Sequence, residues 1–152
     1  MRALVQRVSE GGVEIESKNY NAEISAGMVI LLGVKEGDTE EDVNFVADKC
    51  ANLRIFEDEN GKMNLSVQQI NGEVLIISQF TLYGDTRKGN RPSFNNAAPP
   101  ELANKLYEKF VERMKSRLGE DKVKTGMFGE MMTVKIFNDG PVTVLVESKE
   151  NN

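Results

Sequence analysis

The stretch Glu73-Val74-Leu75-Ile76-Ile77-Ser78-Gln79-Phe80-Thr81-Leu82 decides how this chain folds. Its first part is an apolar run flanked by polar residues, which is typical of a strand buried inside a sheet. We therefore predict a central strand over residues 73–81. Ser78–Leu82 place polar side chains where that strand ends, and sheets often collect the polar groups of a site at such ends. A strand that frays into a turn explains the same residues equally well.

Upstream of this strand, alternation of apolar and polar residues predicts further strands. Ala3–Val8 and Gly12–Glu16 alternate, and Glu10-Gly11-Gly12 suggests a turn that joins them. Val29–Val34 is almost uniformly apolar and indicates a second buried strand. Leu53–Phe56 has the pattern of a further, short strand. We expect these strands to pair mainly in antiparallel fashion.

Two helices are predicted from apolar residues that recur at helical spacing. The first opens at Asp38, which can cap it, with Glu41 three residues on as the partner in a capping box. Its apolar positions are Val43, Val46, Ala47 and Cys50. The second and longest helix begins at Pro99-Pro100, because proline suits the first turn of a helix. Its apolar stripe comprises Leu102, Leu106, Phe110, Met114 and Leu118.

The C-terminal part predicts two closing strands, Met132–Phe137 and Val142–Glu147. Between them, Asn138-Asp139-Gly140-Pro141 carries the Asp-Gly and Gly-Pro signals of a hairpin turn. The predicted class is therefore α+β, a mainly antiparallel sheet system with two principal helices. The length suits a single domain covering residues 1–152.

The composition is that of an ordinary soluble globular protein, with 39% hydrophobic and 28% charged residues. The longest apolar run, Met28–Val34, is much shorter than the roughly 18 residues of a membrane span, so no membrane partner is expected. The first eight residues lack the long apolar core of a signal peptide. Cys50 is the single cysteine and has no partner for an internal disulfide, so we expect a cytoplasmic protein. Its apolar helical neighbours make Cys50 a buried small apolar group rather than a nucleophile.

The absence of histidine narrows the chemistry most. Ser-His and Cys-His catalysis and histidine-liganded metal sites are excluded, and one cysteine cannot build a structural zinc site. We therefore expect no metal and no cofactor. The net charge of −5 and the isoelectric point near 4.9 argue against a protein that coats nucleic acid by charge alone. They leave room for a pocket that grips one end of an RNA through a few local basic groups.

Two more stretches could belong to a site. Tyr83–Phe94 contains the densest basic cluster of the chain, which comprises Arg87, Lys88 and Arg91. Such a cluster suits a loop that grips phosphates, although a solvated loop has the same composition. Thr125–Met131 is a glycine-flanked turn in which Met127 and Phe128 could line a pocket for a ribose or a base. A simple packed turn accounts for that segment at least as well.

Taken together, these stretches resemble the D-aminoacyl-tRNA deacylase family along nearly the whole chain. The first signature is Ser78–Leu82, and the second is Asn138–Thr143. Other matching segments are Met1–Val8, Leu31–Val34, Leu53–Phe56, Gly61–Asn64, Arg87–Phe94 and Thr125–Gly129. They occur in the order expected for the family. The sequence departs from it at Ser17–Ala22, which lack a short glycine-centred turn, and at Glu130, where a small residue is more usual.

The resemblance implies a hydrolase that cleaves the ester between tRNA and a D-amino acid or a misplaced glycine. Such a carboxylic ester hydrolase takes part in D-amino acid metabolism and proofreads translation, with the 3′ end of aminoacyl-tRNA as its partner. The resemblance also implies a compact barrel-like fold and a homodimer. In that dimer a cis peptide at Gly140-Pro141 enters the active site of the other subunit and excludes L-amino acids, with Arg7 orienting its carbonyls. D-amino acids and glycine then fit, which is selection by exclusion.

Two catalytic designs are compatible with the lack of histidine. In one, Thr81 attacks the ester as a nucleophile, which requires an adjacent base. In the other, which we favour, the enzyme positions the ester, a water and the 2′-hydroxyl of the RNA. Ser78 and Gln79 then orient the substrate, and backbone N–H groups near Phe80 and Thr81 stabilise the oxyanion.

The remaining assignments follow the resemblance. Met127 and Phe128 are expected to bind the substrate, and Arg87, Lys88 and Arg91 are expected to bind tRNA. Two alternative functions come from other classes. One is a non-catalytic module that binds an RNA end or a small ligand, and the other is a cofactor-free hydrolase of a different ester or amide.

Overall fold

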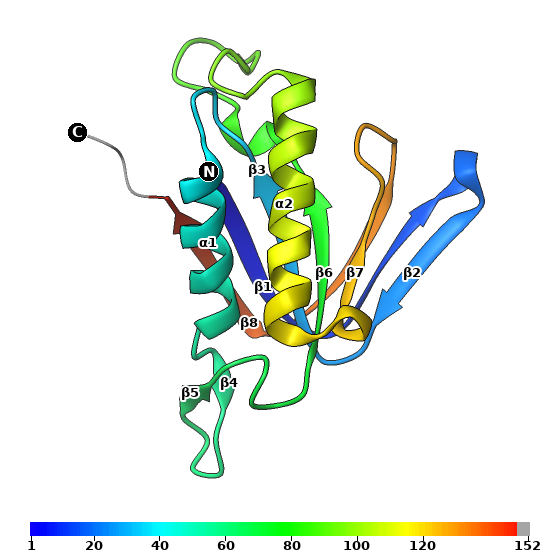
Figure 1. Ribbon diagram of the computed structural model, residues 1–152, viewed down its shortest axis with the longest axis vertical. Helices are drawn as coiled ribbons and strands as arrows, with labels where there is room; N and C mark the ends of the chain where they lie inside the picture. The colour runs from blue at the N-terminus through cyan, green and yellow to red at the C-terminus, as the bar shows by residue number, and fades with distance from the viewer. Residues whose placement is uncertain (149–152) are drawn as a thin grey trace.

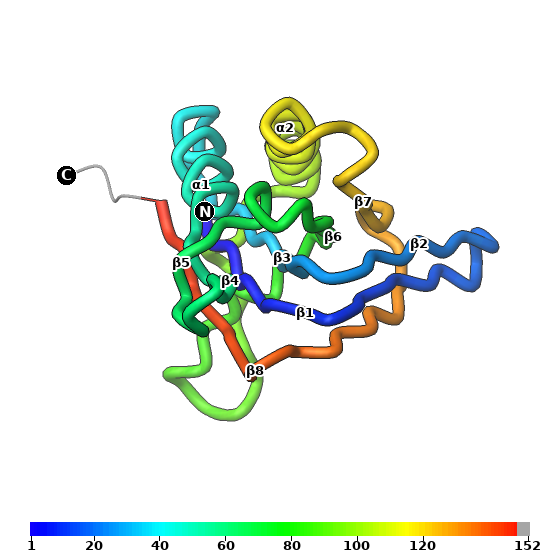
Figure 2. The backbone as a smooth tube through the Cα atoms, turned by 90° about the horizontal axis from the view of Figure 1, so that it is seen from below, coloured from blue at the N-terminus to red at the C-terminus, as the bar shows by residue number. Residues whose placement is uncertain are grey.

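The computed structural model describes residues 1–148, and its main element is a six-stranded sheet in the order β2-β1-β3-β6-β7, with β8 paired to β1. Helices α1 and α2 both pack on one side of this sheet (Figures 1 and 2). The strands are β1 Arg2–Ile15, β2 Tyr20–Ile24, β3 Gly27–Gly33, β6 Glu73–Ser78, β7 Val123–Thr125 and β8 Thr133–Glu147. The sheet curls toward closure, so that the predicted α+β, barrel-like architecture is confirmed.

Strand β1 organises the sheet, since it pairs with three strands, β3, β2 and β8. The predicted turn at residues 10–12 is wrong, because β1 runs through it without a break. A side chain at Gly11 would come within 2.9 Å of Val29 and 3.3 Å of the Lys135 carbonyl oxygen. Gly11 therefore permits close packing of neighbouring strands, which a glycine does as readily as it makes a turn.

The centre of the sheet is parallel, which the sequence did not indicate. Strand β6 pairs in parallel with β3 and with β7. Helix α1, Glu40–Asn52, lies between β3 and β6 in the chain, and α2, Pro100–Leu118, lies between β6 and β7. Parallel neighbours require such crossover connections. All the other pairs are antiparallel, including a separate small hairpin of β4, Phe56–Glu57, and β5, Met63–Leu65.

Two apolar clusters fill the two faces of the sheet. One lies between the sheet and the helices and contains the predicted stripe of α2, in which Leu106, Phe110 and Met114 are buried. The same cluster contains Cys50, fully buried as predicted, and this burial raises the pKa of its thiol to about 12. The second cluster, around Val29 and Ile77, lies inside the curl of the sheet.

The start of α1 lies one residue later than predicted. Thr39 is the N-cap, and it forms a capping box with Asp42. The predicted cap, Asp38, is buried instead and pairs with the α-ammonium group of Met1 at 2.8 Å. Helix α2 begins at the predicted Pro99-Pro100 pair. Within residues 1–148 neither helix is long and apolar enough to cross a membrane.

The predicted hairpin at residues 138–141 is also wrong, because β8 is one strand that stays beside β1 along its whole length. Gln6 pairs with Thr143 and Val8 pairs with Asn138, so only Arg7 of β1 lies opposite residues 139–142 of β8. These four residues form a large bulge, which we call the 139–142 bulge. The Asp-Gly and Gly-Pro signals thus mark a bulge in a continuous strand.

Candidate active site

Strand β6 ends at Ser78, and the chain enters a short 3-10 helix, η2, over Phe80–Tyr83. The predicted strand over residues 73–81 therefore ends three residues early, and only Ser78 of the polar segment lies within the sheet. The Gln79 N–H donates to the Leu32 carbonyl oxygen at 2.8 Å and fixes this end of β6 against β3. A side chain at Gly33 would lie 3.1 Å from Leu82 and 3.2 Å from the Gln79 oxygen, so β3 and η2 are in close contact.

The Gln79 side chain donates a hydrogen bond to the hydroxyl oxygen of Thr81. Neither end of an amide is a base at physiological pH, so this partner cannot remove the proton of Thr81. Phe80, next to them, leaves 57% of its surface exposed. Its ring meets that of Phe94 edge to face, with 5.1 Å between the ring centroids. The segment thus presents two polar side chains beside an aromatic pair.

A pocket of about 710 Å³ opens at this end of β6. Its walls come from the β6–η2 junction, from the segment that leads into α2, and from the loop between β7 and β8. Lining residues include Ser78, Gln79, Phe80, Phe94, Ala97, Ala98, Pro99, Phe128, Gly129, Glu130, Met131 and Met132. The structure thus brings Ser78, Gln79 and Phe80 together with Phe128. Neither Thr81 nor Met127 is among the lining residues. Thr81 is hydrogen-bonded to Gln79, which does line the pocket, and Met127 packs against the second apolar cluster.

Glu130 is the one ionisable residue among those that line this pocket. Its carboxylate lies 3.7 Å from the Lys18 ammonium, and both side chains are at least one-third exposed. A pair this exposed contributes about 0–1 kcal/mol. Lys18 belongs to Ser17–Ala22, one of the two places where the sequence departs from the family resemblance. Glu130 is the other. The two departures therefore contact each other at the rim of the pocket.

The Gly140-Pro141 peptide is cis and lies at the exposed tip of the 139–142 bulge. Arg7, only 7% exposed, donates from Nε to the Asp139 carbonyl oxygen at 2.9 Å. It also donates from Nη1 to the Ile55 carbonyl oxygen at 2.8 Å. From the other side, the Val142 N–H donates to the Asn138 side chain at 2.8 Å. Arg7 was expected to orient the carbonyls of Gly140 and Pro141. Its Nε instead binds the carbonyl of Asp139, the residue before Gly140.

Within one chain, the bulge lies away from the pocket. Arg7 pairs with Met28, and Met28 pairs with Val74, whereas Leu32 and Ser78 pair at the pocket end. Four residues along a strand span roughly 13 Å, and the bulge is on the far side of β1 as well. Neither Gly140 nor Pro141 is among the residues that line the pocket.

The basic loop begins beside the pocket and is closed by a bridge between Asp85 and Ser93. Arg87 donates two hydrogen bonds to the Asp85 carboxylate, at 2.9 and 2.8 Å. These bonds lower the pKa of Asp85 to about 2, and the two paired side chains together carry no net charge. Lys88 and Arg91, both exposed, flank the tip of the loop at Gly89. Sequence reasoning did not take into account that Asp85, two residues before Arg87, could pair with its guanidinium.

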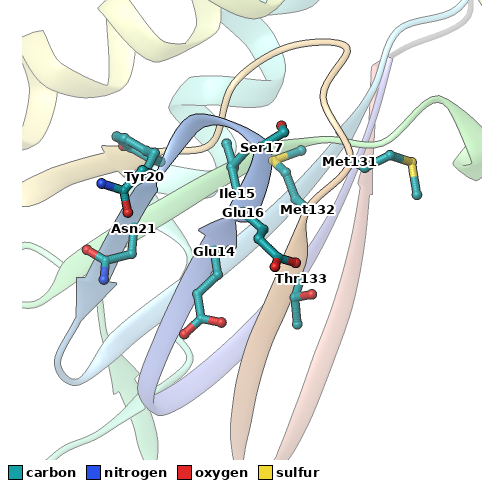
Figure 3. A pocket seen from close by; sticks show the side chains of 10 residues that line it. Glu14, Ile15, Glu16, Ser17, Tyr20, Asn21, Met131, Met132 and Thr133 are labelled. Carbon is teal, nitrogen blue, oxygen red and sulfur yellow. The ribbon is translucent and has the colours of Figure 1, made fainter.

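A second hollow of about 800 Å³ adjoins the first and shares Met131 and Met132 with it. Figure 3 shows its wall, which consists of the β1–β2 hairpin and the start of β8. The Tyr20 hydroxyl in this hairpin donates to the Thr125 carbonyl oxygen at 2.7 Å and ties the hairpin to the end of β7. Sequence reasoning did not identify this hollow, because it depends on the path of β8.

Among residues 1–148, no group of three or more histidine, cysteine, aspartate or glutamate side chains is arranged to hold a metal ion. The polar groups that line the pocket are the Ser78 hydroxyl, the Gln79 amide, the Glu130 carboxylate and backbone groups. Such a set can orient and polarise an uncharged carbonyl group in an otherwise apolar site.

Comparison with known proteins gives one consistent family. A family model described as D-Tyr-tRNA(Tyr) deacylase matches residues 4–147. The chain is 55% identical to the D-aminoacyl-tRNA deacylase of Thermosipho africanus over 150 residues, which cover 99% of each chain. It is 56% identical to the protein of the same name from Thermotoga petrophila, again over 99% of each chain.

Two solved structures share the fold. One, titled c-Myc DNA Unwinding Element Binding Protein, superposes with a TM-score of 0.92 at 39% identity and covers 99% of this chain and 100% of its own. The other, titled as a probable eukaryotic D-amino acid tRNA deacylase, superposes with a TM-score of 0.81 over 96% of this chain and 98% of its own. Its identity is 17%, so this second likeness concerns the fold alone.

Proposed function

The chain belongs to the D-Tyr-tRNA(Tyr) deacylase family, and we propose that it hydrolyses the ester that joins a D-amino acid to the 3′ end of tRNA. The convergence of Ser78, Gln79 and Phe80 with Phe128 around one pocket carries this proposal. Mischarged glycyl-tRNA is a second substrate, since glycine has no side chain to exclude. The enzyme acts as one domain in the cytoplasm, where charged tRNA is found, and removes D-amino acids before translation uses them.

The pocket suits the terminal adenosine and its ester. The rings of Phe80, Phe94 and Phe128 offer apolar faces on which a base or ribose can pack, as aromatic side chains do in single-stranded RNA recognition. Ser78 and Gln79 supply the few polar groups that fix orientation. Met127 packs against the second apolar cluster and does not line this pocket.

Catalysis proceeds by positioning rather than through an acyl-enzyme on Thr81. The partner of the Thr81 hydroxyl is the Gln79 amide, which is not a base, and the chain has no histidine. The scissile ester is already activated by the neighbouring 2′-hydroxyl of the ribose. The enzyme therefore has to hold that hydroxyl and a water against the ester carbonyl, which is the contribution of orientation.

The oxyanion is stabilised at the start of η2. Phe80 and Thr81 are its first residues, and the first N–H groups of a helix have no acceptor within it. Each donor aimed at a developing oxyanion is typically worth about 2.7–4 kcal/mol. The Gln79 amide adds a further donor when it turns from Thr81 to the substrate.

Chiral selection comes from a homodimer in which the bulge of one subunit enters the pocket of the other. The Gly140 and Pro141 carbonyls then face the α-carbon of the substrate and leave room for hydrogen only. Two features of the chain support this arrangement. The bulge is exposed and fixed by Arg7, and it does not line the pocket of its own chain. Separating the dimer should therefore reduce chiral discrimination as well as rate.

The basic loop holds the tRNA backbone. Lys88 and Arg91 are exposed in the loop that leads to Phe94, and Phe94 lines the pocket. Phosphates of the acceptor end would pass along this loop. Arg87 contributes less, because its guanidinium is already paired with the Asp85 carboxylate. Phosphate contacts of this kind position the RNA without reading its sequence.

The direct test is to incubate the protein with D-tyrosyl-tRNA and to measure the release of D-tyrosine. Release at a rate proportional to enzyme concentration supports the proposal. Binding without release would instead indicate a module that recognises RNA ends. Release of acyl groups from simple esters but not from tRNA would indicate a hydrolase of another class.

A further inference from the structure

The lining of the first pocket contains one charged residue. Of its lining residues only Glu130 is ionisable, and the others are apolar, aromatic or neutral polar groups. An isolated carboxylate beside an apolar surface attracts cations more strongly than one in open solvent, because the local dielectric constant is lower. The same carboxylate repels phosphate. A ligand with both groups should thus enter with its cation toward Glu130 and its phosphates away.

The partner that Glu130 has in the free protein is easily replaced. The Lys18 ammonium lies 3.7 Å from the carboxylate, beyond hydrogen-bond distance, and half of the Lys18 side chain is exposed. Lys18 comes from the tip of the β1–β2 hairpin, outside the pocket lining. An ammonium group brought by a ligand can take the place of Lys18 without any change in the backbone.

We propose that Glu130 is a specificity-determining residue whose carboxylate binds the ammonium group of the aminoacyl ester in exchange for Lys18. This inference rests on the proposed function, since it takes the aminoacyl end of a charged tRNA as the ligand. The ammonium can come from the α-amino group, which every aminoacyl ester carries, or from a cationic side chain such as that of D-lysine.

The experiment compares the full-length protein with Glu130→Gln, which keeps shape and removes charge. Glu59→Gln is the matched control, because Glu59 is exposed in the β4–β5 turn and lines none of the pockets described above. Unchanged melting temperatures establish that both variants fold. The ligands are adenosine analogues that carry D-tyrosine through a stable 3′-amide, with the α-amino group either free or acetylated. Binding is measured by calorimetry, and the kinetics of D-tyrosyl-tRNA and D-lysyl-tRNA hydrolysis are measured in parallel.

We expect Glu130→Gln to weaken binding of the free-amino analogue about tenfold, as for a partly exposed charged contact, and to leave the acetylated analogue unchanged. KM for D-tyrosyl-tRNA should rise by a similar factor with little change in kcat, which is the signature of lost uniform binding. If only D-lysyl-tRNA is affected, the ammonium is that of the side chain. Lys18→Gln should lower KM, because the competing cation is removed.

Three results would overturn the inference. Equal losses for the free-amino and acetylated analogues would assign Glu130 a structural role. Indistinguishable behaviour of Glu130→Gln and Glu59→Gln with all ligands would remove Glu130 from recognition. A rise in KM for Lys18→Gln would contradict the exchange. Failure of the proposed function looks different, because the wild-type protein itself would then release no D-tyrosine from tRNA.

Discussion

Arg7 Nε donates a hydrogen bond to the Asp139 carbonyl oxygen across 2.9 Å, from the single β1 position that faces the 139–142 bulge. The same guanidinium donates to the Ile55 carbonyl oxygen at 2.8 Å, so that one buried side chain ties the bulge to the segment before β4. The position of Gly140 and Pro141 therefore depends on a residue more than 130 positions earlier in the chain.

Replacing Arg7 by lysine should loosen the bulge. A lysine ammonium is a single point donor and cannot span the two carbonyls as the guanidinium does. One buried carbonyl left unpaired costs about 1–3 kcal/mol of unfolding free energy. Chemical denaturation measures that loss, and a D/L hydrolysis ratio measures the proposed chiral selection. Arg54→Lys is the control, since Arg54 is exposed and donates to one carbonyl. An Arg7→Lys variant with full stability and full discrimination would contradict this role.

Thr81→Ala should retain activity within about tenfold of the wild type, because Thr81 lacks the adjacent base that a nucleophile requires. Gln79→Ala should lose more, up to the 10²–10³-fold in kcat that removal of an oxyanion donor typically costs. Steady-state kinetics on D-tyrosyl-tRNA compares the two variants. Isolation of an acyl group on Thr81 would establish the opposite mechanism.

Lys88→Ala and Arg91→Ala should each weaken tRNA binding by the same factor for every aminoacyl group. Each lost phosphate contact should also reduce the slope of log binding constant against log salt by about 0.7–0.9. Arg87→Ala should have the smallest effect of the three, because Asp85 already binds its guanidinium. Binding titrations at several salt concentrations provide the test. A change in D/L selectivity would instead move the loop to the amino-acid pocket.

Stability should fall at alkaline pH partly because of Cys50. Burial raises its pKa from 9.0 to about 12, so above pH 9 the unfolded chain loses a proton that the folded chain keeps. The stabilising contribution is complete below pH 9 and is lost as pH rises toward 12, by at most about 1.4 kcal/mol per pH unit. Denaturation curves at pH 8–11 should show a shallower decline for Cys50→Ala. Parallel declines would indicate that the thiol titrates normally.

The elements that the sequence predicted well are those with a strong local signal. Val29–Val34 and the Val74–Ile77 run are apolar throughout because they lie in the middle of the sheet, and β3 and β6 occupy them. The stripe of α2 required only helical spacing. The parallel pairing of β3 with β6 could not be predicted in this way, because it depends on how the crossover through α1 returns.

The turn signals misled at two places for one physical reason. Glycine and proline mark positions where backbone geometry is unusual, and a turn is one such place among several. At Gly11 the requirement is close strand packing, and at Gly140-Pro141 it is a bulge opposite Arg7. Both depend on a partner strand far away in sequence. The chain alone does not reveal that β1 and β8 pair at Gly11 and on both sides of the 139–142 bulge.

The candidate site was predictable in parts rather than as a whole. Ser78–Phe80 and Phe128 stood out as polar or apolar residues in unexpected places, and they do meet at one pocket. Phe94 and Ala97–Pro99 form another wall. Phe94 closes a stretch that the sequence marked for its basic residues, whereas Ala97–Pro99 carry no such signal, because they only lead into α2. Likewise, the contact between Lys18 and Glu130 joins two segments that are separated by more than 100 residues.

The hydrolysis of matched D- and L-tyrosyl-tRNA under identical conditions tests the central claim most directly. In the proposed dimer, the Gly140 and Pro141 carbonyls exclude an L side chain. D-Tyrosyl-tRNA should therefore be cleaved at least about a hundredfold faster than L-tyrosyl-tRNA, a difference of about 2.7 kcal/mol in activation free energy. L-Tyrosyl-tRNA should be lost no faster than without enzyme. Equal rates for the two substrates would contradict chiral selection, and no release from either would contradict the deacylase function itself.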